Sequence, residues 1–250
     1  LRGNVSFNKN IITKTFYQEF KQVPQKSSLL SENDNVYIQG YSVGAWLGYD
    51  FAGIDPKTGH TLAYAEDGTK VDMDMFNNRT LALKRPPMHY LGEGNPTTTG
   101  GFATEFRYKQ WELNAQFEFQ TGHLIPTISS TMNHNYNYSG NRYIADQYRW
   151  RAVGDVAERP YLGINNTAYD QYRFNTSLEK GDYLRCTYTS LGYRLTEELC
   201  KKLSVRSARI AITASNLFTL TNFKGIDPAS MGTLSYPSTR TYSITLNVGF

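Results

Sequence analysis

The chain has 250 residues, 40% of them hydrophobic and 19% charged, which is the composition of a folded protein and excludes a disordered chain. A small net charge of +4, carried by scattered basic residues, argues against nucleic acid as a partner. No run of about 18 apolar residues is present, which excludes transmembrane helices but not barrel strands, because alternating strands have a hydrophilic average.

Aromatic residues make up 14% of the chain, and the mean hydropathy is −0.52. We therefore expect many rings at boundaries between apolar and wet surroundings. The chain opens at Leu1 without a signal segment, so we expect a mature chain or a piece of a longer one. The first strands expected are residues 3–12 and 41–52, followed by a short one at 60–65.

Two regular runs come next. In residues 102–108 and 111–119 the side chains alternate between apolar and polar, and only Lys109 and Gln110 separate the runs. This spacing predicts a tight β-hairpin.

The last third of the chain predicts three more strands, at residues 182–195, 207–217 and 242–250. Between the first two, residues 196–203 have a capping-box start at Thr196 and predict one short helical turn. The total is about seven or eight strands with almost no helix. If Cys186 lies near the start of its strand, Cys200 is too far away for a disulfide.

The connections between these strands have unequal lengths. Those at 109–111 and 196–206 are short, whereas those at 122–181 and 218–239 are long. If neighbouring strands are antiparallel, all short connections lie at one end of the sheet. Short periplasmic turns and long extracellular loops are typical of outer-membrane barrels. A soluble β-sandwich with a functional loop is the alternative interpretation.

The longest connection mixes amide and aromatic side chains. Rings could stack on sugar faces while amides bond to hydroxyls, and a peptide backbone would suit the same groups. Loop residues that pack on themselves are the simpler interpretation. The aromatic candidates for ligand contact are Tyr136, Tyr138, Tyr143, Tyr148 and Trp150.

Other motifs favour structural roles. Ser42 stands in a G-x-S-x-G sequence, but the residues after it are aromatic and glycine-rich, which disfavours the helix that an esterase elbow requires. The Asp-Pro pairs at Asp55 and Asp227 indicate turns after strands.

No metal site is predicted from the histidines, His60, His89, His123 and His134, because they lack ligand spacing. The acidic cluster around Gly68 leaves calcium possible, with a polar turn preferred. Its members are Glu66, Asp67, Asp72 and Asp74.

Several segments, in matching order and spacing, resemble the C-terminal end of SusC/RagA-type TonB-dependent outer-membrane transporters. The segments are 181–185, 191–193, 199–203, 215–219, the Gly225-Ile226-Asp227-Pro228 motif and 236–242. Upstream, residues 40–49, 94–102 and 150–155 also resemble this family, so the likeness extends over nearly the whole chain. Departures from the family pattern include Thr196 in place of a frequent proline and Cys200 in place of an aliphatic residue.

The resemblance implies an all-β fold: the C-terminal strands of a large antiparallel transmembrane β-barrel of about 22 strands in the complete protein. On this interpretation residues 1–250 are the C-terminal portion of the barrel domain, and the plug domain and TonB box are absent from this chain. A sheet of seven or eight strands in lipid would leave unpaired edges, so we expect it to pair with the remaining strands of the same transporter.

The family implies a location in the cell outer membrane and import of oligosaccharides or oligopeptides, with no enzymatic activity and no cofactor. Its implied partners are outer-membrane lipid, the plug, the TonB complex through the missing N-terminal part, and a SusD-like surface lipoprotein. That lipoprotein would act as a lid, so the aromatic candidates of the long loop are also candidate lid contacts. A soluble, secreted all-β carbohydrate-binding module is the alternative.

The last strand also resembles the signal that the barrel-assembly machinery reads. Its alternate residues are apolar and the chain ends in an aromatic residue. The residues concerned are Tyr242, Ile244, Leu246, Val248 and Phe250.

Overall fold

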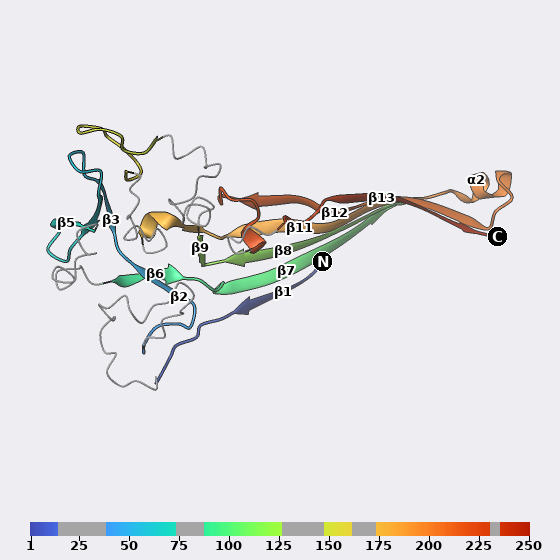
Figure 1. The fold of residues 1–250 in the computed structure, drawn as a ribbon. Helices are drawn as coiled ribbons and strands as arrows, with labels where there is room; N and C mark the ends of the chain where they lie inside the picture. Colours follow the sequence, from blue (N-terminus) through green and yellow to red (C-terminus); the bar gives the residue numbers. More distant parts are fainter. Residues whose placement is uncertain (15–38, 74–87, 127–147, 162–173, 231–235) are drawn as a thin grey trace.

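The computed structural model describes residues 1–14, 39–73, 88–126, 148–161, 174–230 and 236–250 (Figure 1). Within these residues the chain is almost entirely β-structure, as predicted, but it has thirteen strands rather than seven or eight. The additional strands are short and lie in the long connections. The strands are β1 (Arg2–Phe7), β2 (Ala45–Gly48), β3 (Phe51–Ile54), β4 (Thr61–Tyr64), β5 (Lys70–Asp72), β6 (His89–Glu93), β7 (Thr98–Tyr108), β8 (Trp111–Thr121), β9 (Leu124–Pro126), β10 (Leu178–Lys180), β11 (Tyr183–Arg194), β12 (Ser207–Thr221) and β13 (Thr241–Gly249).

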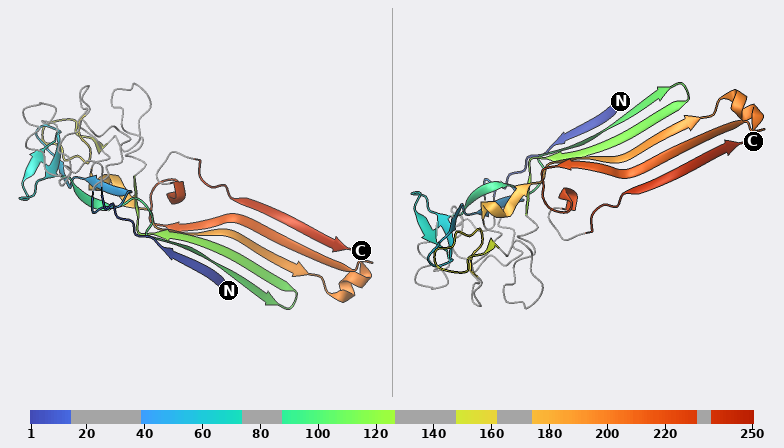
Figure 2. Two further views of the ribbon diagram at one scale, coloured as in Figure 1. Left: turned by 90° about the horizontal axis from the view of Figure 1, so that it is seen from below. Right: turned by 90° about the horizontal axis from the view of Figure 1, so that it is seen from above.

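Six strands form one long antiparallel sheet, which we call the main sheet. Their order is β1-β7-β8-β11-β12-β13, so β1 and β13 are its two edges (Figures 1 and 2). The three other sheets are small and lie at one end of the main sheet: β2-β6, β3-β4-β5 and β9-β10. Among the described residues the main sheet is open at both edges, which agrees with the expectation that it needs further strands.

The predicted hairpin is confirmed. Strands β7 and β8 pair from Thr98 opposite Thr121 to Tyr108 opposite Trp111, with a two-residue turn between them. Lys109 has a φ of 53°, the left-handed conformation that two-residue hairpin turns require. The predicted strand at the end of the chain is confirmed as β13, and the one before it, β12, continues four residues further than predicted.

The short connections do lie at one end of the sheet, together with the C-terminus (Figure 1). The longer of them contains α2 (Glu197–Lys202), which confirms the predicted helical turn. The predicted capping box is wrong, because the side chain of Thr196 at the N-cap makes no capping hydrogen bond. Cys200 in this helix and Cys186 in β11 are both buried and unpaired, as the disulfide argument predicted.

The long strand predicted at residues 41–52 is wrong, because it is divided between two sheets. Strands β2 and β3 are separated at Tyr49 and Asp50, where the segment at Phe174 and Asn175 inserts. The Asn175 backbone N–H donates to the Tyr49 carbonyl at 3.0 Å, and its side-chain amide donates to the Asp50 carboxylate at 2.8 Å. A contact 125 residues distant in sequence therefore sets this break.

The first predicted strand is shorter than expected, since β1 ends at Phe7. The prediction at residues 60–65 is confirmed as β4. The β3-β4-β5 sheet and its flanking residues form a compact core in which Tyr49, Ala63, Met73 and Phe174 are buried. Within the described residues, no helix is long and apolar enough to cross a membrane.

Candidate functional site

One face of the main sheet is apolar and exposed. The register places Phe106, Leu113, Leu191, Ile212 and Ile244 in one row across five neighbouring strands. These side chains have exposed fractions between 39% and 74%. A soluble protein rarely exposes a continuous apolar surface of this kind, so the face is a candidate for contact with lipid or with a partner.

The next row of the same face, at the end with the short connections, is aromatic. Tyr108, Trp111 and Tyr193 stand beside one another in the register, followed by Ile210 and Leu246. The rings of Trp111 and Tyr193 have centroids 4.9 Å apart. Amphipathic rings in this position are typical of the interface between hydrocarbon and water.

The opposite face is polar along the same strands. Glu105, Asn114, Ser190, Thr213 and Ser243 form a row across it. The alternation predicted from sequence thus divides the sheet into two chemically different surfaces, as in a barrel wall with a wet lumen.

Near the short connections this polar face carries a charged cluster. The Glu112 side chain is mostly buried, and its carboxylate lies 2.6 Å from Arg194, 3.1 Å from Arg209 and 4.0 Å from Arg107. Three arginines around one carboxylate give the cluster an excess of positive charge, which Glu105 reduces through its ion pair with Arg107.

A β-bulge decides which residues of β11 reach the polar face. Between Cys186 and Tyr188 the register shifts by one residue, at Thr187. On the C-terminal side of the bulge, Tyr188 and Ser190 belong to the polar face, whereas on its N-terminal side Arg185 does. One extra residue exchanges the two faces of a strand, and bulges do this without ending the pairing.

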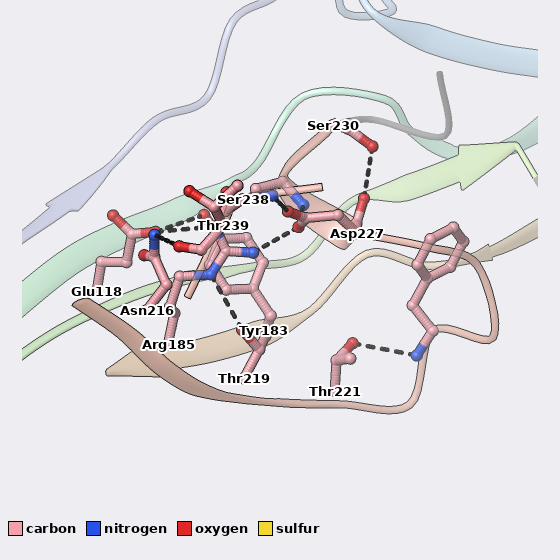
Figure 3. A network of polar contacts seen from close by, with 12 residues as sticks. Glu118, Tyr183, Arg185, Asn216, Thr219, Thr221, Asp227, Ser230, Ser238 and Thr239 are labelled. Atoms are coloured by element: carbon pink, nitrogen blue, oxygen red, sulfur yellow. Dashed lines mark hydrogen bonds and ion pairs between the residues drawn. The ribbon is translucent and has the colours of Figure 1, made fainter. Parts of the chain in front are cut away.

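Arg185 is the centre of a buried polar network (Figure 3). Its guanidinium forms an ion pair with Asp227, which lies in the connection between β12 and β13. It also donates to the hydroxyls of Thr219, at 3.0 Å, and Ser238, at 3.1 Å, and it lies over the Tyr183 ring. Because both charged side chains are nearly inaccessible to water, removal of either one would leave the other unpaired.

The Asp227 carboxylate is held in its ionised form. Burial opposes ionisation, but the backbone N–H groups of Ala229 and Ser238 and the Arg185 guanidinium together keep the pKa of Asp227 below its usual value. The Ser230 hydroxyl also donates to the Asp227 carbonyl at 2.7 Å, which holds the 3-10 helix η7 (Pro228–Ser230) in place.

The returning part of the same connection is attached a second time. Asn216 has a φ of 51°, a conformation that asparagine adopts more readily than most residues, and its side-chain amide donates to the Thr239 carbonyl at 3.0 Å. Several segments that carry the family resemblance, around Arg185, Asn216, Asp227 and Ser238, therefore meet at one place (Figure 3). They fix the β12–β13 connection against the polar face.

Of the aromatic loop candidates, Tyr136, Tyr138 and Tyr143 lie outside the described residues. Tyr148 is more than half exposed. The Trp150 indole N–H donates to the Pro56 carbonyl at 2.9 Å, and its ring packs against Gly59 and, edge to face, Tyr161. Trp150 therefore has a structural role in addition to the contact role predicted for it.

The residues predicted as an assembly signal lie on the exposed edge strand. Tyr242, Ile244, Leu246 and Val248 project from the apolar face of β13, and Phe250 is 93% exposed.

The remaining motifs take structural positions. Ser42 donates to the Glu93 carboxylate, and strand β2 follows where an esterase elbow requires a helix. The Asp67 carboxylate accepts from the N–H and hydroxyl of Thr69, which is the polar turn preferred above. Among the described residues no three His, Cys, Asp or Glu side chains gather as a metal site; His134 and Asp74 fall outside that set, and calcium stays a prediction.

The network around Arg185 was not found by sequence reasoning. Asp227 was predicted only as a turn residue, and Arg185 entered only as part of a family motif. One signal in the sequence could have found it. In an uninterrupted β11 the charged side chain of Arg185 would lie on the apolar face, which indicates a bulge that moves it to the polar face.

The chain is similar to known proteins of one kind. It is 23% identical over 243 residues to TonB-dependent receptor P3 of Formosa agariphila, which covers 88% of this chain and 23% of that protein. It is 24% identical over 184 residues to TonB-dependent receptor P26 of the same organism, covering 64% of this chain and 18% of that protein. No model of a protein family matches the chain.

Solved structures of RagAB share the fold. The RagAB peptide transporter superposes with a TM-score of 0.72 and 24% identity, covering 99% of this chain and 27% of that chain. The RagAB peptide importer in its open-open state gives 0.70 and 22%, covering 99% and 26%. The chain thus spans about a quarter of the length of the proteins it matches. The motifs, the relatives and the fold all agree with the resemblance to TonB-dependent transporters of the SusC/RagA type.

Proposed function

We propose that the chain forms part of the barrel wall of a transporter in the cell outer membrane. On this proposal the transporter imports oligosaccharides or oligopeptides, energised through TonB and assisted by a SusD-like surface lipoprotein. The observation that carries the proposal is the exposed apolar row from Phe106 to Ile244 across five strands, backed by a polar row on the other face. Lipid would cover the first surface, and the second would face the lumen.

The chain would bind and guide cargo rather than perform bond chemistry. The plug, the TonB box and further strands would come from the rest of the transporter. Loop tyrosines would contact cargo or the lipoprotein, and Tyr148 is the one of these candidate tyrosines that the structure describes; it is more than half exposed. Trp150 would hold its loop in shape.

A soluble carbohydrate-binding module would need a different explanation for the apolar face. The two proposals differ in their dependence on detergent. We expect the transporter that contains this chain to separate with outer membranes and to stay in solution only in detergent micelles. Recovery of a monodisperse protein without detergent would favour the soluble module.

Uptake measurements test the transport proposal and the class of cargo. Cells that produce the transporter should accumulate labelled oligosaccharides or labelled oligopeptides, and cells without TonB should not. Two pools of matched size, one of each class, would identify the cargo. Equal accumulation with and without the transporter would contradict the proposal.

The last strand supplies a separate prediction. Deletion of Phe250, which is exposed at the chain end, should reduce membrane insertion strongly if the assembly machinery reads this residue. The heat-modifiable shift in gel mobility measures insertion. Substitution of Tyr236, an exposed aromatic residue outside the strands, by alanine is the control. Normal insertion after deletion of Phe250 would show that the signal lies elsewhere.

A further inference from the structure

His123 is the buried polar side chain that the proposed function leaves unused. It is only 3% exposed, and neither ring nitrogen has a hydrogen-bonding partner among the described residues. Buried polar groups without partners are uncommon in folded proteins because each one costs free energy. The position therefore calls for an explanation.

His123 lies where the main sheet gives way to a smaller one. The pairing of β8 with β11 ends at Gln120 opposite Tyr183, and the pairing of β9 with β10 begins at Leu124 opposite Lys180. The β9–β10 pair, which we call the stem, carries both ends of the long connection that contains Tyr148.

Four residues between the two pairings form a joint, which we call the hinge: Gly122, His123, Gly181 and Asp182. Two hydrogen bonds cross it. The Gly122 N–H donates to the Asp182 carboxylate at 2.7 Å, and the Gly181 N–H donates to the His123 carbonyl at 2.9 Å.

The ring of His123 closes this hinge by contact with Gly181. A Cβ atom at position 181 would collide with the imidazole, so the ring occupies the space that the glycine leaves. Gly122 has a φ of 81°, which allows the abrupt change of direction on the opposite strand. Two glycines facing each other across a pair of strands are well suited to a change in the angle of the stem.

We propose that the hinge is acid-sensitive: the neutral His123 ring holds the stem against the main sheet, and uptake of a proton by the ring releases it. This inference does not depend on the cargo of the transporter. Its consequence is that acidification would change the angle between the stem and the main sheet.

The charges around the ring favour this behaviour. Burial lowers the pKa of His123 below its usual value, and the Asp182 carboxylate opposes this only in part. Asp182 also has one oxygen engaged by Gly122. The facing strand β10 carries two more charged side chains. The Glu179 carboxylate accepts a hydrogen bond from the Lys224 N–H, and Lys180 is exposed to water.

The direction of the effect follows from linkage. Above the ordinary histidine pKa of 6.5, the ring is neutral in the closed and the open hinge, and proton binding favours neither state. Below it the open hinge binds a proton that the closed hinge does not. The closed hinge should then lose about tenfold in relative population for each pH unit, until its own pKa is reached.

Hydrogen–deuterium exchange on the complete transporter in lipid nanodiscs tests the proposal. Protection of residues 122–126 and 178–182, relative to the rates of unprotected peptides, should fall by about tenfold per unit between pH 6.5 and the closed-state pKa. In His123→Leu the fall should disappear. His89→Leu, at an exposed histidine outside the hinge, should behave like the native protein.

A second variant covers the case in which His123→Leu does not fold. Asp182→Asn keeps an oxygen for the Gly122 N–H but removes the charge that favours the protonated ring, so the pKa of the closed hinge should move downward and the fall in protection should continue to a lower pH. Protection that does not change with pH in the native protein would overturn the proposal. The same pH dependence in His123→Leu would overturn it as well, and so would a fall in Asp182→Asn that ends at the same pH as in the native protein.

Discussion

The main sheet and the three small sheets at its end are held together by different kinds of contact. In the main sheet β7, β8, β11, β12 and β13 each pair with a neighbour over nine to eleven positions. In the small sheets the pairings have three or four positions, and single side chains such as Trp46 and Trp150 join segments far apart in sequence.

This difference shows which strands the pattern of side chains determines and which depend on individual contacts. Alternation of side chains is enough to determine a long strand and both of its faces. A register shift of one residue would move every apolar side chain of the strand to the opposite face. Short strands lack that repetition. Their positions depend on individual contacts, such as the insertion of Asn175 beside Tyr49.

The sharpest test concerns the place where the main sheet itself relies on one contact. In Arg185→Met the Asp227 carboxylate stays buried without its partner, and the free energy of unfolding should fall by about 3–5 kcal/mol. Urea denaturation of the transporter in micelles measures this change.

Arg194 is the matched control, because it lies on the same strand and pairs with Glu112 but is 62% exposed. Arg194→Met should cost at most about 1 kcal/mol. Equal losses in the two variants would mean that burial of the Arg185 pair has no special weight.

A second test addresses the two faces. In lipid, Ile212→Lys should lower the stability by about 2–4 kcal/mol near the middle of the bilayer, because the charge would enter hydrocarbon. Thr213→Lys, one residue further on the polar face, should cost much less. Denaturation in lipid vesicles compares them. Similar small effects would indicate that water covers both faces.

A third test weakens the small-sheet region alone. Trp150→Phe keeps the ring but removes the bond to the Pro56 carbonyl, which should cost about 1 kcal/mol locally. Exchange protection around residues 55–60 and 150–155 should fall, while that of β7 and β8 stays unchanged. Trp111→Phe on the main sheet is the control, and loss of protection throughout the chain would contradict a local role.

The smallest effect expected is a pH dependence of the β12–β13 connection. The pKa of folded Asp227 is lowered, so its contribution to stability is fully present above the ordinary value of 3.8 and is lost as the pH falls through the folded value. Asp227→Asn leaves Arg185 without its ion pair at every pH, and it should flatten this pH dependence in exchange measurements from pH 5 downward. If the pH dependence of exchange is the same in this variant, other carboxylates cause it.

Much of the main sheet could be predicted from sequence. Ile210, Ile212 and Ala214 recur at every second position, and the two-residue spacing at Lys109 and Gln110 predicts the hairpin. These signals are local, so the sequence contains them directly. The aromatic end row is a further consequence of the same parity.

The buried network could not be predicted in this way. Simple alternation from Ser190 back to Arg185 would place the arginine on the apolar face, and only the extra residue Thr187 reverses the assignment. Pairing of Arg185 with Asp227, 42 positions later, depends on how the connection folds back. Trp150 is similar, since its partner Pro56 lies 94 positions earlier.

The two edges of the main sheet differ in the order in which they can form. A connection of about twenty residues separates β13 from its partner β12. Residues 8–97 separate β1 from its partner β7. Loop closure over the longer span is slower and costs more entropy. The β7–β8 hairpin and the strands after it can therefore assemble first, and β1 would join last, once the intervening small sheets have folded.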